Sequence, residues 1–162
     1  WLEPEKHPMV PHLPPCINHL VSQECEIVIP RRRTFTNYPQ YQHYCEVWAN
    51  WEAANITGRP DLDLWVGVRI MTRKAAHVLV SYDGCRGDNW EILFVPVITL
   101  LSLSRRITIG SVTVDYIHPI EQLVEDDNAM RTKRDKQRTD LLNAMKAEAD
   151  AVGLKPKLVS SH

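Results

Sequence analysis

The sequence predicts a single α+β domain in which a mostly antiparallel sheet packs against a few helices, preceded by an extended, proline-rich arm. Its 162 residues are about the length of one domain, long enough to bury a core without disulfide or metal support. Short apolar runs rich in β-branched residues alternate with segments of helical spacing, which indicates a mixture of strands and helices. We place the arm at residues 1–23, the α+β core with its C-terminal helix at 24–158, and a tail at 159–162.

The arm is predicted from its prolines, which are Pro4, Pro8, Pro11, Pro14 and Pro15. Proline lacks an N–H group and fixes φ, so this density favours extended chain over a helix or a sheet ladder. An extended arm exposes apolar side chains that have no partner nearby in the sequence, and we expect it to dock into an apolar groove of a second copy. The residues that we assign to this self-association are Met9, Val10, Leu13, Pro14 and Pro15.

The first part of the core is predicted to contain a strand at residues 25–29 and a helix at 40–54. In that helix, aromatic and thiol side chains recur every three or four residues, which predicts one buried face. Its members are Tyr41, Tyr44, Cys45, Trp48 and Trp51. Apolar runs predict further strands at 64–70, 77–82 and 90–103, and Pro96 argues for an edge position or a break in the last of these.

The last strand, ITIGSVTVDYI at 107–117, has apolar side chains that change parity at Gly110. A bulge at Gly110 would return them to one buried face. The C-terminal helix is predicted to begin at the N-cap Thr139 and to end before Gly153, which takes the C′ position. Its apolar face consists of Leu141, Leu142, Met145 and Val152.

Composition narrows the classes of function. A formal net charge of −1 and a pI near 6.7 argue against a dedicated nucleic-acid-binding domain, which normally carries a clear basic excess. The four cysteines form no CxxC pair, so we expect reduced thiols and a cytosolic compartment. The longest apolar stretch, at 92–103, is shorter than the roughly 20 residues of a spanning helix, and no signal peptide precedes the core. These features predict a soluble or peripheral protein.

Short motifs add little to this interpretation. The RGD tripeptide at 86–88 lies among turn-forming residues, and the sequon at 55–57 has no secretory signal before it. Cys16, His19 and Cys25, with His43 and Cys45, have the chemistry of metal ligands but lack the paired spacing of a zinc site. No hydrolase, phosphate-loop or metalloprotease motif is present. We therefore expect no catalytic residues, no cofactor and no bound metal.

Basic residues gather in short clusters despite the nearly neutral total charge. The clusters are Arg31, Arg32 and Arg33 in IPRRRTFTNY, Arg73 and Lys74, Arg105 and Arg106, and Lys133, Arg134, Lys136 and Arg138. Cations beside aromatic side chains suit an anionic bilayer surface and suit phosphate groups equally well. Charge runs are also ordinary solvated surface. If the clusters are functional, we expect them to share one face.

The order of these features resembles the core of rhabdovirus matrix proteins. The resemblance runs through RRRTFTNY, the tryptophan-bearing CEVWANW, TGRPDLDLWVGVRIM, the late strand RITIGSVTVDYI and the C-terminal DLLNAMKAEADAVGLKPKL, and it covers most of residues 24–158. It implies an α+β domain that polymerises beneath the viral envelope, condenses the helical nucleocapsid and drives budding. The chain differs from the family pattern because PHLPP at 11–15 has no following tyrosine and the arm has few lysines.

This resemblance implies a virion protein that also occupies the host cytoplasm and the cytoplasmic face of membranes. Its partners would be other copies of itself, the viral nucleoprotein, an anionic membrane surface and RNA. We assign membrane binding to Arg31, Arg32, Arg33, Arg73 and Lys74. We assign nucleocapsid binding to Lys133, Arg134, Lys136 and Arg138.

Two other functions fit the same sequence. One is a nucleic-acid-binding viral or phage accessory protein, in which the arginines contact phosphates and Tyr38 and Tyr41 stack on bases. The other is a small enzyme whose catalytic groups come from distant positions. A pocket with convergent titratable groups would favour the enzyme.

Overall fold

The computed structural model describes residues 1–84, 89–103, 107–121 and 127–155. In chain order, its elements are the 3₁₀ helix η1 (Pro4–His12), α1 (Leu13–Ser22), β1 (Ile27–Arg32), α2 (Gln40–Thr57), η2 (Leu64–Val66), β2 (Ile70–Met71), α3 (Arg73–Val80), η3 (Asn89–Leu93), α4 (Val95–Ser102), β3 (Ile109–Val114) and α5 (Asn128–Ala151). The RGD tripeptide, Arg105, Arg106 and the tail at 159–162 lie outside the described residues. A single α+β domain is confirmed.

The sheet is small and mixed, so the expectation of a mostly antiparallel sheet is corrected. Its strand order is β2-β1-β3, with β1 in the centre. Strand β1 pairs antiparallel with β2, where Ile27 lies opposite Met71, and parallel with β3, where Ile27 lies opposite Ile109. A parallel partner requires a long crossover, and the segment from α2 to α4 supplies it.

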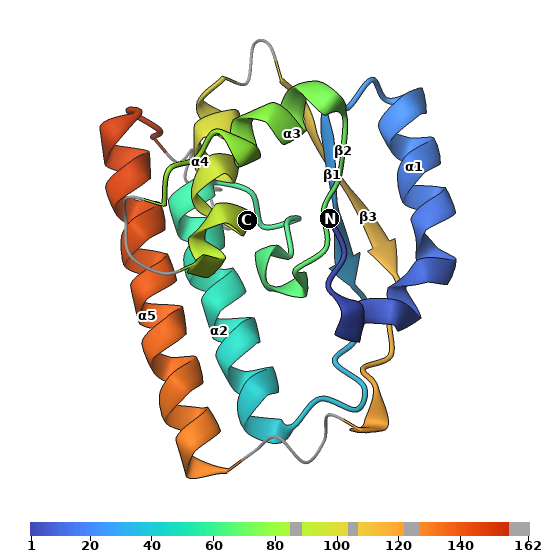
Figure 1. Cartoon of the computed structure of the whole chain (residues 1–162), viewed down its shortest axis with the longest axis vertical. Helices are drawn as coiled ribbons and strands as arrows, with labels where there is room; N and C mark the ends of the chain where they lie inside the picture. Colours follow the sequence, from blue (N-terminus) through green and yellow to red (C-terminus); the bar gives the residue numbers. More distant parts are fainter. Residues whose placement is uncertain (85–88, 104–106, 122–126, 156–162) are drawn as a thin grey trace, which may run out of the picture.

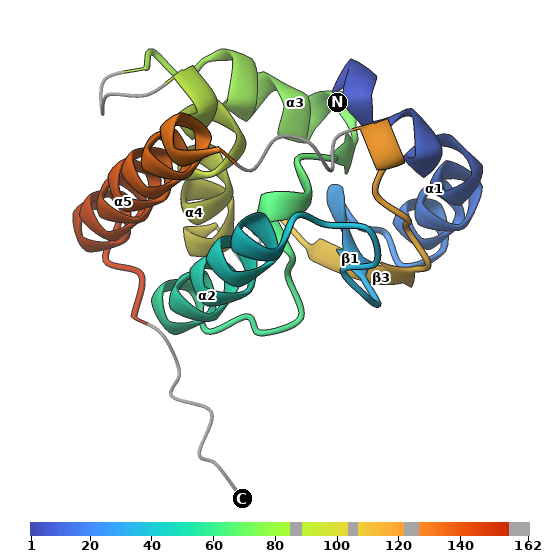
Figure 2. The ribbon, with the colours of Figure 1, turned by 90° about the horizontal axis from the view of Figure 1, so that it is seen from below.

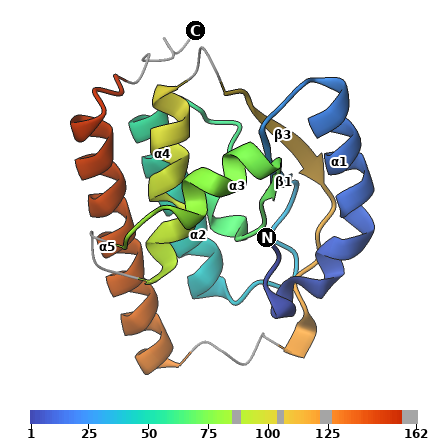
Figure 3. The same cartoon turned by 45° about the horizontal axis from the view of Figure 1, so that its top comes forward.

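Helices cover both faces of this sheet. Figure 1 shows α1 on one side, with α2, α4 and α5 on the other and α5 in the outermost position beside α2. The view in Figure 2 separates these layers, and Figure 3 shows α3 running between α4 and the sheet. The core is continuous across the layers and joins Ile27 and Ile29 of β1 to Leu141 and Met145 of α5.

The N-terminal segment is helical and packed, not an extended arm. Residues 4–22 form η1 and α1, and Met9 and Cys16 are completely buried. The prolines are compatible with these helices because Pro14 and Pro15 lie in the first turn of α1, where backbone N–H groups have no partner within the helix. Met9 is therefore not available for self-association and Leu13 is half-buried, whereas Val10, Pro14 and Pro15 are exposed.

Two segments predicted as strands are helices. Residues 73–80 form α3, whose N-cap Thr72 accepts a hydrogen bond from the Ala75 N–H at 3.3 Å. The apolar run at 90–103 forms η3 and α4, and Pro96 lies in the first turn of α4 rather than in a strand. Before these two helical segments, the predicted strand at 64–70 is reduced to η2 and the first residue of β2.

The late strand is confirmed as β3, but without a bulge. Its register with β1 is continuous through Gly110, which lies opposite Val28. Side chains that alternate between the two faces of the sheet can all be apolar, because helices cover both faces. Glycine is needed here for a different reason: a Cβ at Gly110 would lie 2.9 Å from the Cys25 Sγ and from the His19 ring.

The C-terminal helix is longer than predicted. It begins at the N-cap Asp127, whose side chain accepts a hydrogen bond from the Met130 N–H at 2.8 Å, and not at Thr139. Its end agrees with the prediction, because Gly153 has a φ of +67° just after the C-cap Val152. Leu141, Leu142 and Met145 are buried as expected.

Helix α2 is confirmed and Cys45 is buried as predicted, but the aromatic residues of the predicted buried face are not buried. Tyr44, Trp48 and Trp51 are exposed, and Trp51 keeps 60% of its surface accessible. The buried residues of α2 include three polar ones, Gln42, Glu46 and Thr57. The aromatic face therefore points to solvent, and the inner face of α2 contains polar side chains that need partners.

No helix in the described part of the chain is long and apolar enough to cross a bilayer.

Candidate functional site: a cation-lined pocket

A buried ion-pair network joins β1 to α2 and to the segment before η2. The guanidinium of Arg32 has no exposed side-chain surface and forms two hydrogen bonds to Asp63, from Nε to Oδ2 and from Nη2 to Oδ1, each 2.6 Å long. Its Nη1 donates to the Tyr38 hydroxyl at 2.7 Å and also contacts the carboxylate of Glu46. Such a paired, forked geometry is the one that best compensates a guanidinium for loss of water.

A second set of polar groups holds the carboxylates in place. The Asn50 amide donates to Asp63 Oδ1 at 2.8 Å, while its oxygen accepts from the Leu64 N–H at 2.9 Å. The Gln42 amide donates to Glu46 Oε1 at 2.7 Å. Gln42, Glu46 and Asn50 are spaced by four residues, so α2 presents a polar row to the network.

The network shifts the pKa values of its members. Burial alone would raise the pKa of Asp63, but the positive charge of Arg32 and its hydrogen bonds outweigh burial, and the pKa of this carboxyl is lowered. Burial raises the pKa of Tyr38, so its hydroxyl stays protonated and serves as a neutral partner. The site is therefore an ionised guanidinium between two carboxylates.

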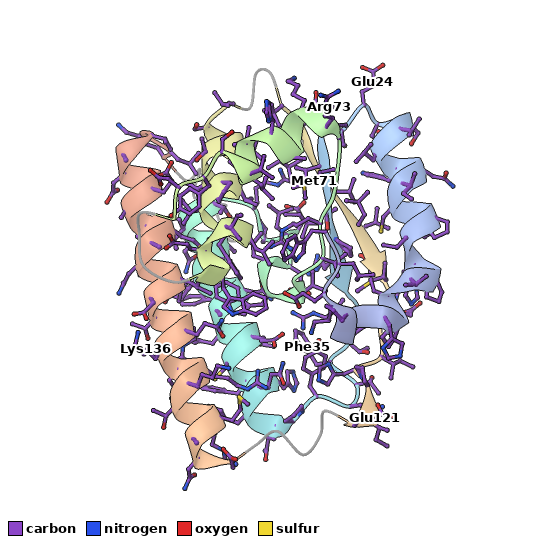
Figure 4. The ribbon with its side chains drawn as sticks, viewed as in Figure 1. Glu24, Phe35, Met71, Arg73, Glu121 and Lys136 are labelled. Carbon is purple, nitrogen blue, oxygen red and sulfur yellow. The ribbon has the colours of Figure 1, made fainter. Side chains whose placement is uncertain are left out.

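This arrangement corrects one membrane-binding assignment. Arg32 is internal and cannot contact a bilayer, whereas Arg31 and Arg33 on either side of it are exposed. Arg73 and Lys74 are also exposed, but they follow β2, which pairs with the beginning of β1, while Arg31 and Arg33 lie at its end. Figure 4 shows Arg73 and Phe35 at opposite ends of the sheet. These clusters do not form one patch.

A pocket of about 340 Å³ lies where η1, α2, η2, η3 and α5 meet. Its lining residues combine charged, aromatic and apolar groups. They are Glu3, Lys6, Gln42, Cys45, Glu46, Trp65, Gly67, Trp90, Leu93, Phe94, Met130, Lys133, Arg134, Gln137, Arg138 and Leu141. Since Glu46 belongs to both, the pocket opens directly onto the buried network.

The pocket brings together three of the four residues assigned to nucleocapsid binding. Lys133, Arg134 and Arg138 all line it from one face of α5. Lys136 does not: it is exposed on the outer side of α5, where it pairs with Asp140, as Figure 4 shows by its position. Helical spacing places Lys136 nearly opposite Arg134 and Arg138, although it is close to Lys133, and this separation can be read from the sequence.

Lys6 and Gln42 also line the pocket and were missed by the sequence analysis. Each keeps only 6% of its surface exposed. The Lys6 ammonium lies 6.0 Å from the centre of the Tyr116 ring and has no carboxylate within ion-pair distance among the described residues. The Gln42 Oε1 atom is buried without a hydrogen-bond partner in the described part of the structure. Nothing in the sequence marks either residue, because their burial depends on packing between distant segments.

His118 lies beside this charged region. It is buried, stacks on Tyr38 with ring centres 4.0 Å apart, and neither of its ring nitrogens has a partner among the described residues. Burial, reinforced by the positive charges of Lys6, Arg32 and Arg134, lowers the pKa of His118 to about 4. The imidazole is therefore neutral at physiological pH.

The pocket lacks the usual signs of covalent chemistry. Cys45 is the thiol in its lining, and burial raises the pKa of this thiol, which disfavours the nucleophilic thiolate. Within the described ranges, no three His, Cys, Asp or Glu side chains gather as a metal site. His19 and Cys25 do approach each other across Gly110.

Comparison with protein-family models, with curated proteins and with solved structures finds no match to this chain.

The buried network predicts unequal effects of the three consecutive arginines. Arg32→Met leaves Asp63 and Glu46 buried without their cation, so we expect a loss of about 3–5 kcal/mol in the free energy of unfolding. Arg31→Met and Arg33→Met change exposed residues, and we expect about 0.5 kcal/mol or less, up to about 1 kcal/mol if the exposed Arg33–Asp115 pair contributes. Urea unfolding followed by tryptophan fluorescence measures all three. Equal midpoints for the three variants would contradict the role of Arg32.

His118 predicts a pH dependence of stability. Its pKa is about 4 when folded, against about 6.5 when unfolded, so the unfolded chain binds the proton first as pH falls. Stability should therefore decrease between pH 6.5 and 4, by up to about 3 kcal/mol. Asp63, whose folded pKa is lowered, loses its contribution only as pH falls below about 4. In His118→Phe, the loss of stability between pH 6.5 and 4 should disappear. In His7→Asn, which changes an exposed histidine, the loss should remain. An unchanged slope in His118→Phe would show that another group causes it.

Proposed function

We propose that this chain is a non-enzymatic structural protein of the viral matrix kind, which polymerises and links an anionic membrane to a nucleocapsid. The observation that carries the proposal is a pair of exposed apolar stripes on different sides of the molecule. Two unlike surfaces that fit each other give a heterologous contact, which propagates instead of closing as a dimer. A protein layer beneath an envelope needs that type of contact.

The first stripe lies on α2 and consists of Tyr44, Val47, Trp48 and Trp51, which we call the aromatic stripe. Their spacing places them on one face of the helix, and all four are exposed, Tyr44 by 62%. Tryptophan and tyrosine are the residues most enriched at the energetic centres of protein interfaces. Solvent exposure of several such residues on one helix favours an interaction surface over ordinary helix packing.

The second stripe consists of Ile17 and Val21 on α1 and of Val10 near the end of η1, and we call it the α1 stripe. These side chains are exposed, Val21 by 69%, and they follow one another at intervals of seven and four residues. Figure 2 shows α1 and α2 on opposite sides of the sheet, so one copy can present both stripes at once. Of the five residues first assigned to self-association, Val10 belongs to this stripe.

Membrane contact is assigned to the exposed members of the basic clusters. Arg31 and Arg73 make no ion pair in the described part of the chain, whereas Arg33 pairs with Asp115 at 2.6 Å and Lys74 with Glu26 at 2.9 Å. Exposed pairs of this kind contribute little and exchange readily for lipid phosphates. The chain would thus lie beneath the envelope in the virion and at the cytoplasmic face of host membranes.

Nucleocapsid contact is assigned to Lys133, Arg134 and Arg138, whose side chains converge on the pocket. A second function, RNA binding in an accessory protein, is favoured by two cation–aromatic pairs on the same side. Arg131 lies 5.3 Å from the Tyr41 ring centre, and Arg138 lies 4.7 Å from that of Trp48. Arginine planes and aromatic rings are the groups on which unpaired bases stack.

The proposal predicts polymerisation that depends on both stripes. We expect light scattering of the purified chain to increase with concentration, and Val21→Asp or Trp51→Asp alone to abolish the increase, because a charge cannot be buried unpaired in an interface. An equimolar mixture of the two variants should form dimers that do not grow, since each variant retains one intact surface. Analytical ultracentrifugation distinguishes dimer from polymer.

Val80→Asp is the control for this experiment, because Val80 is an exposed apolar residue on α3 outside both stripes. It should polymerise like the parent chain. Polymerisation of both stripe variants, or failure of their mixture to pair, would exclude the two stripes as the complementary surfaces.

Membrane contact predicts flotation with acidic vesicles. Each exposed arginine near an anionic bilayer is worth about 1 kcal/mol, so the double variant Arg31→Ser with Arg33→Ser should reduce partition by roughly ten-fold or more. Salt at about 0.5 M should release the parent chain, and neutral vesicles should not bind it. Lys136→Ser with Lys146→Ser removes the same charge from exposed positions of α5, where the two lysines pair with Asp140 and Glu52, and is the matched control. Equal losses in both double variants would mean that net charge, and not this cluster, controls binding.

A further inference from the structure

The pocket has the features of a built binding site. Its volume of about 340 Å³ falls within the roughly 300–1,000 Å³ typical of small-ligand pockets. Such pockets combine apolar walls with a few polar groups that fix the orientation of the ligand. In this pocket, two kinds of polar group could contact a ligand: cations, and a buried acceptor that has no partner among the described residues.

The cations outnumber the carboxylates in the lining. The lining contains Lys6, Lys133, Arg134 and Arg138 but only two carboxylates, Glu3 and Glu46. Glu46 is already bonded to Arg32 and Gln42, and Arg138 pairs with Asp135 at 3.0 Å. Lys6 is the most informative member, because it is nearly buried and has no ion-pair partner among the described residues. An anion bound in the pocket would supply the counter-ion that the Lys6 ammonium lacks.

The Gln42 side chain indicates that the ligand also donates a hydrogen bond. Its amide nitrogen is held by Glu46, which fixes the side chain and leaves Oε1 as a buried acceptor without a partner in the described structure. Chloride and sulfate have no hydrogen-bond donor for this acceptor, and hydrogen phosphate, which has an O–H group, leaves the aromatic part of the lining without a partner. A ligand with a hydroxyl or amino group in addition to its negative charge satisfies both Lys6 and Gln42.

Aromatic side chains form the remaining part of the lining. Trp65 and Phe94 pack against each other with ring centres 4.7 Å apart, and Trp90 is partly exposed beside them. Planar aromatic surfaces of this type bind flat ring systems by stacking. The ligand that these features describe has a flat ring, a hydrogen-bond donor and a phosphate-like charge.

We propose that this pocket binds a nucleoside phosphate. The phosphate would lie at Lys6, Lys133 and Arg138, a hydroxyl or amino group would lie at Gln42, and the base would lie against Trp65 and Trp90. The pocket lies on the inner side of α2. It approaches the aromatic stripe where Arg138 lies against Trp48, but its lining residues belong to neither stripe, so this binding goes beyond the assembly role and does not depend on it. The same chemistry is offered by a free mononucleotide and by the phosphorylated end of an RNA strand.

Titration with adenosine 5′-monophosphate, followed by calorimetry and by quenching of tryptophan fluorescence, tests the proposal. We expect the mononucleotide to bind at least about ten-fold more tightly than inorganic phosphate or adenosine alone, because each of these engages only part of the lining. Lys133→Gln should weaken binding by about ten-fold, since it removes one charged contact to phosphate. Trp90→Ala should also weaken it.

Two matched controls separate site binding from general charge attraction. Lys136→Gln makes the same change on the outer side of α5, and Trp51→Ala removes a tryptophan from the aromatic stripe, so both should bind as the parent does. The proposal is overturned if the mononucleotide binds no better than phosphate, or if Lys133→Gln and Lys136→Gln lose affinity equally. Lys133→Gln should polymerise like the parent chain, so a loss of nucleotide binding in this variant can be distinguished from a failure of assembly.

A competition experiment identifies the source of the ligand. A 5′-phosphorylated tetranucleotide RNA that displaces the mononucleotide, when its 5′-hydroxyl counterpart does not, supports the site with an RNA end as its ligand. Failure of the phosphorylated strand to compete supports the site with a free nucleotide as its ligand. Displacement by both strands equally would overturn the proposal, because it would show contact with the RNA backbone in general.

Discussion

The buried guanidinium of Arg32 imposes the strongest constraint on this fold. It binds Asp63 with two 2.6 Å hydrogen bonds, and it also contacts Glu46 and Tyr38, so one side chain connects β1, the turn after it, α2 and the segment before η2. A buried ion pair stabilises a fold only when its geometry is nearly complete, and removal of one member is far more costly than replacement of the whole group. The network therefore fixes the position of α2 more strictly than apolar packing would.

The orientation of α2 follows from this constraint. The helix must direct Gln42, Glu46 and Asn50 inward, because these residues bond to the network or support it. Its aromatic residues then have only the opposite face, and Tyr44, Trp48 and Trp51 point to solvent. A helix that would be expected to bury its tryptophans instead displays them, and the surface proposed for assembly is a direct consequence of a polar contact inside the domain.

The sequence predicts those helices and strands that have a clear local pattern. Prediction fails where contacts with residues distant in the sequence determine the structure or the burial of a side chain. The strand at the beginning of the core and the helix at 40–54 were predicted correctly because apolar spacing and flanking residues agree there. The sequence predicts strands at 77–82 and 90–103, because short β-branched runs do not distinguish a strand from a buried helix. Thr72, as an N-cap, is the signal in the sequence for α3. Arg32 could not be separated from Arg31 and Arg33, because three adjacent arginines differ only in what the fold places beside them. Lys6 and Gln42 were missed for the same reason.

The pocket and the network are parts of one electrostatic arrangement. Glu46 contributes to both, so the charge of the lining and the charge inside the domain are coupled across a single carboxylate. The low pKa of His118 reflects the same charges. Besides burial, the positive charges of Lys6 and Arg134 in the pocket and of Arg32 in the network disfavour the protonated imidazole. An anion in the pocket would reduce this positive field and thereby raise the pKa of His118. Ligand binding and protonation of a buried histidine would then favour each other, and this reciprocity follows from linkage whichever anion is bound.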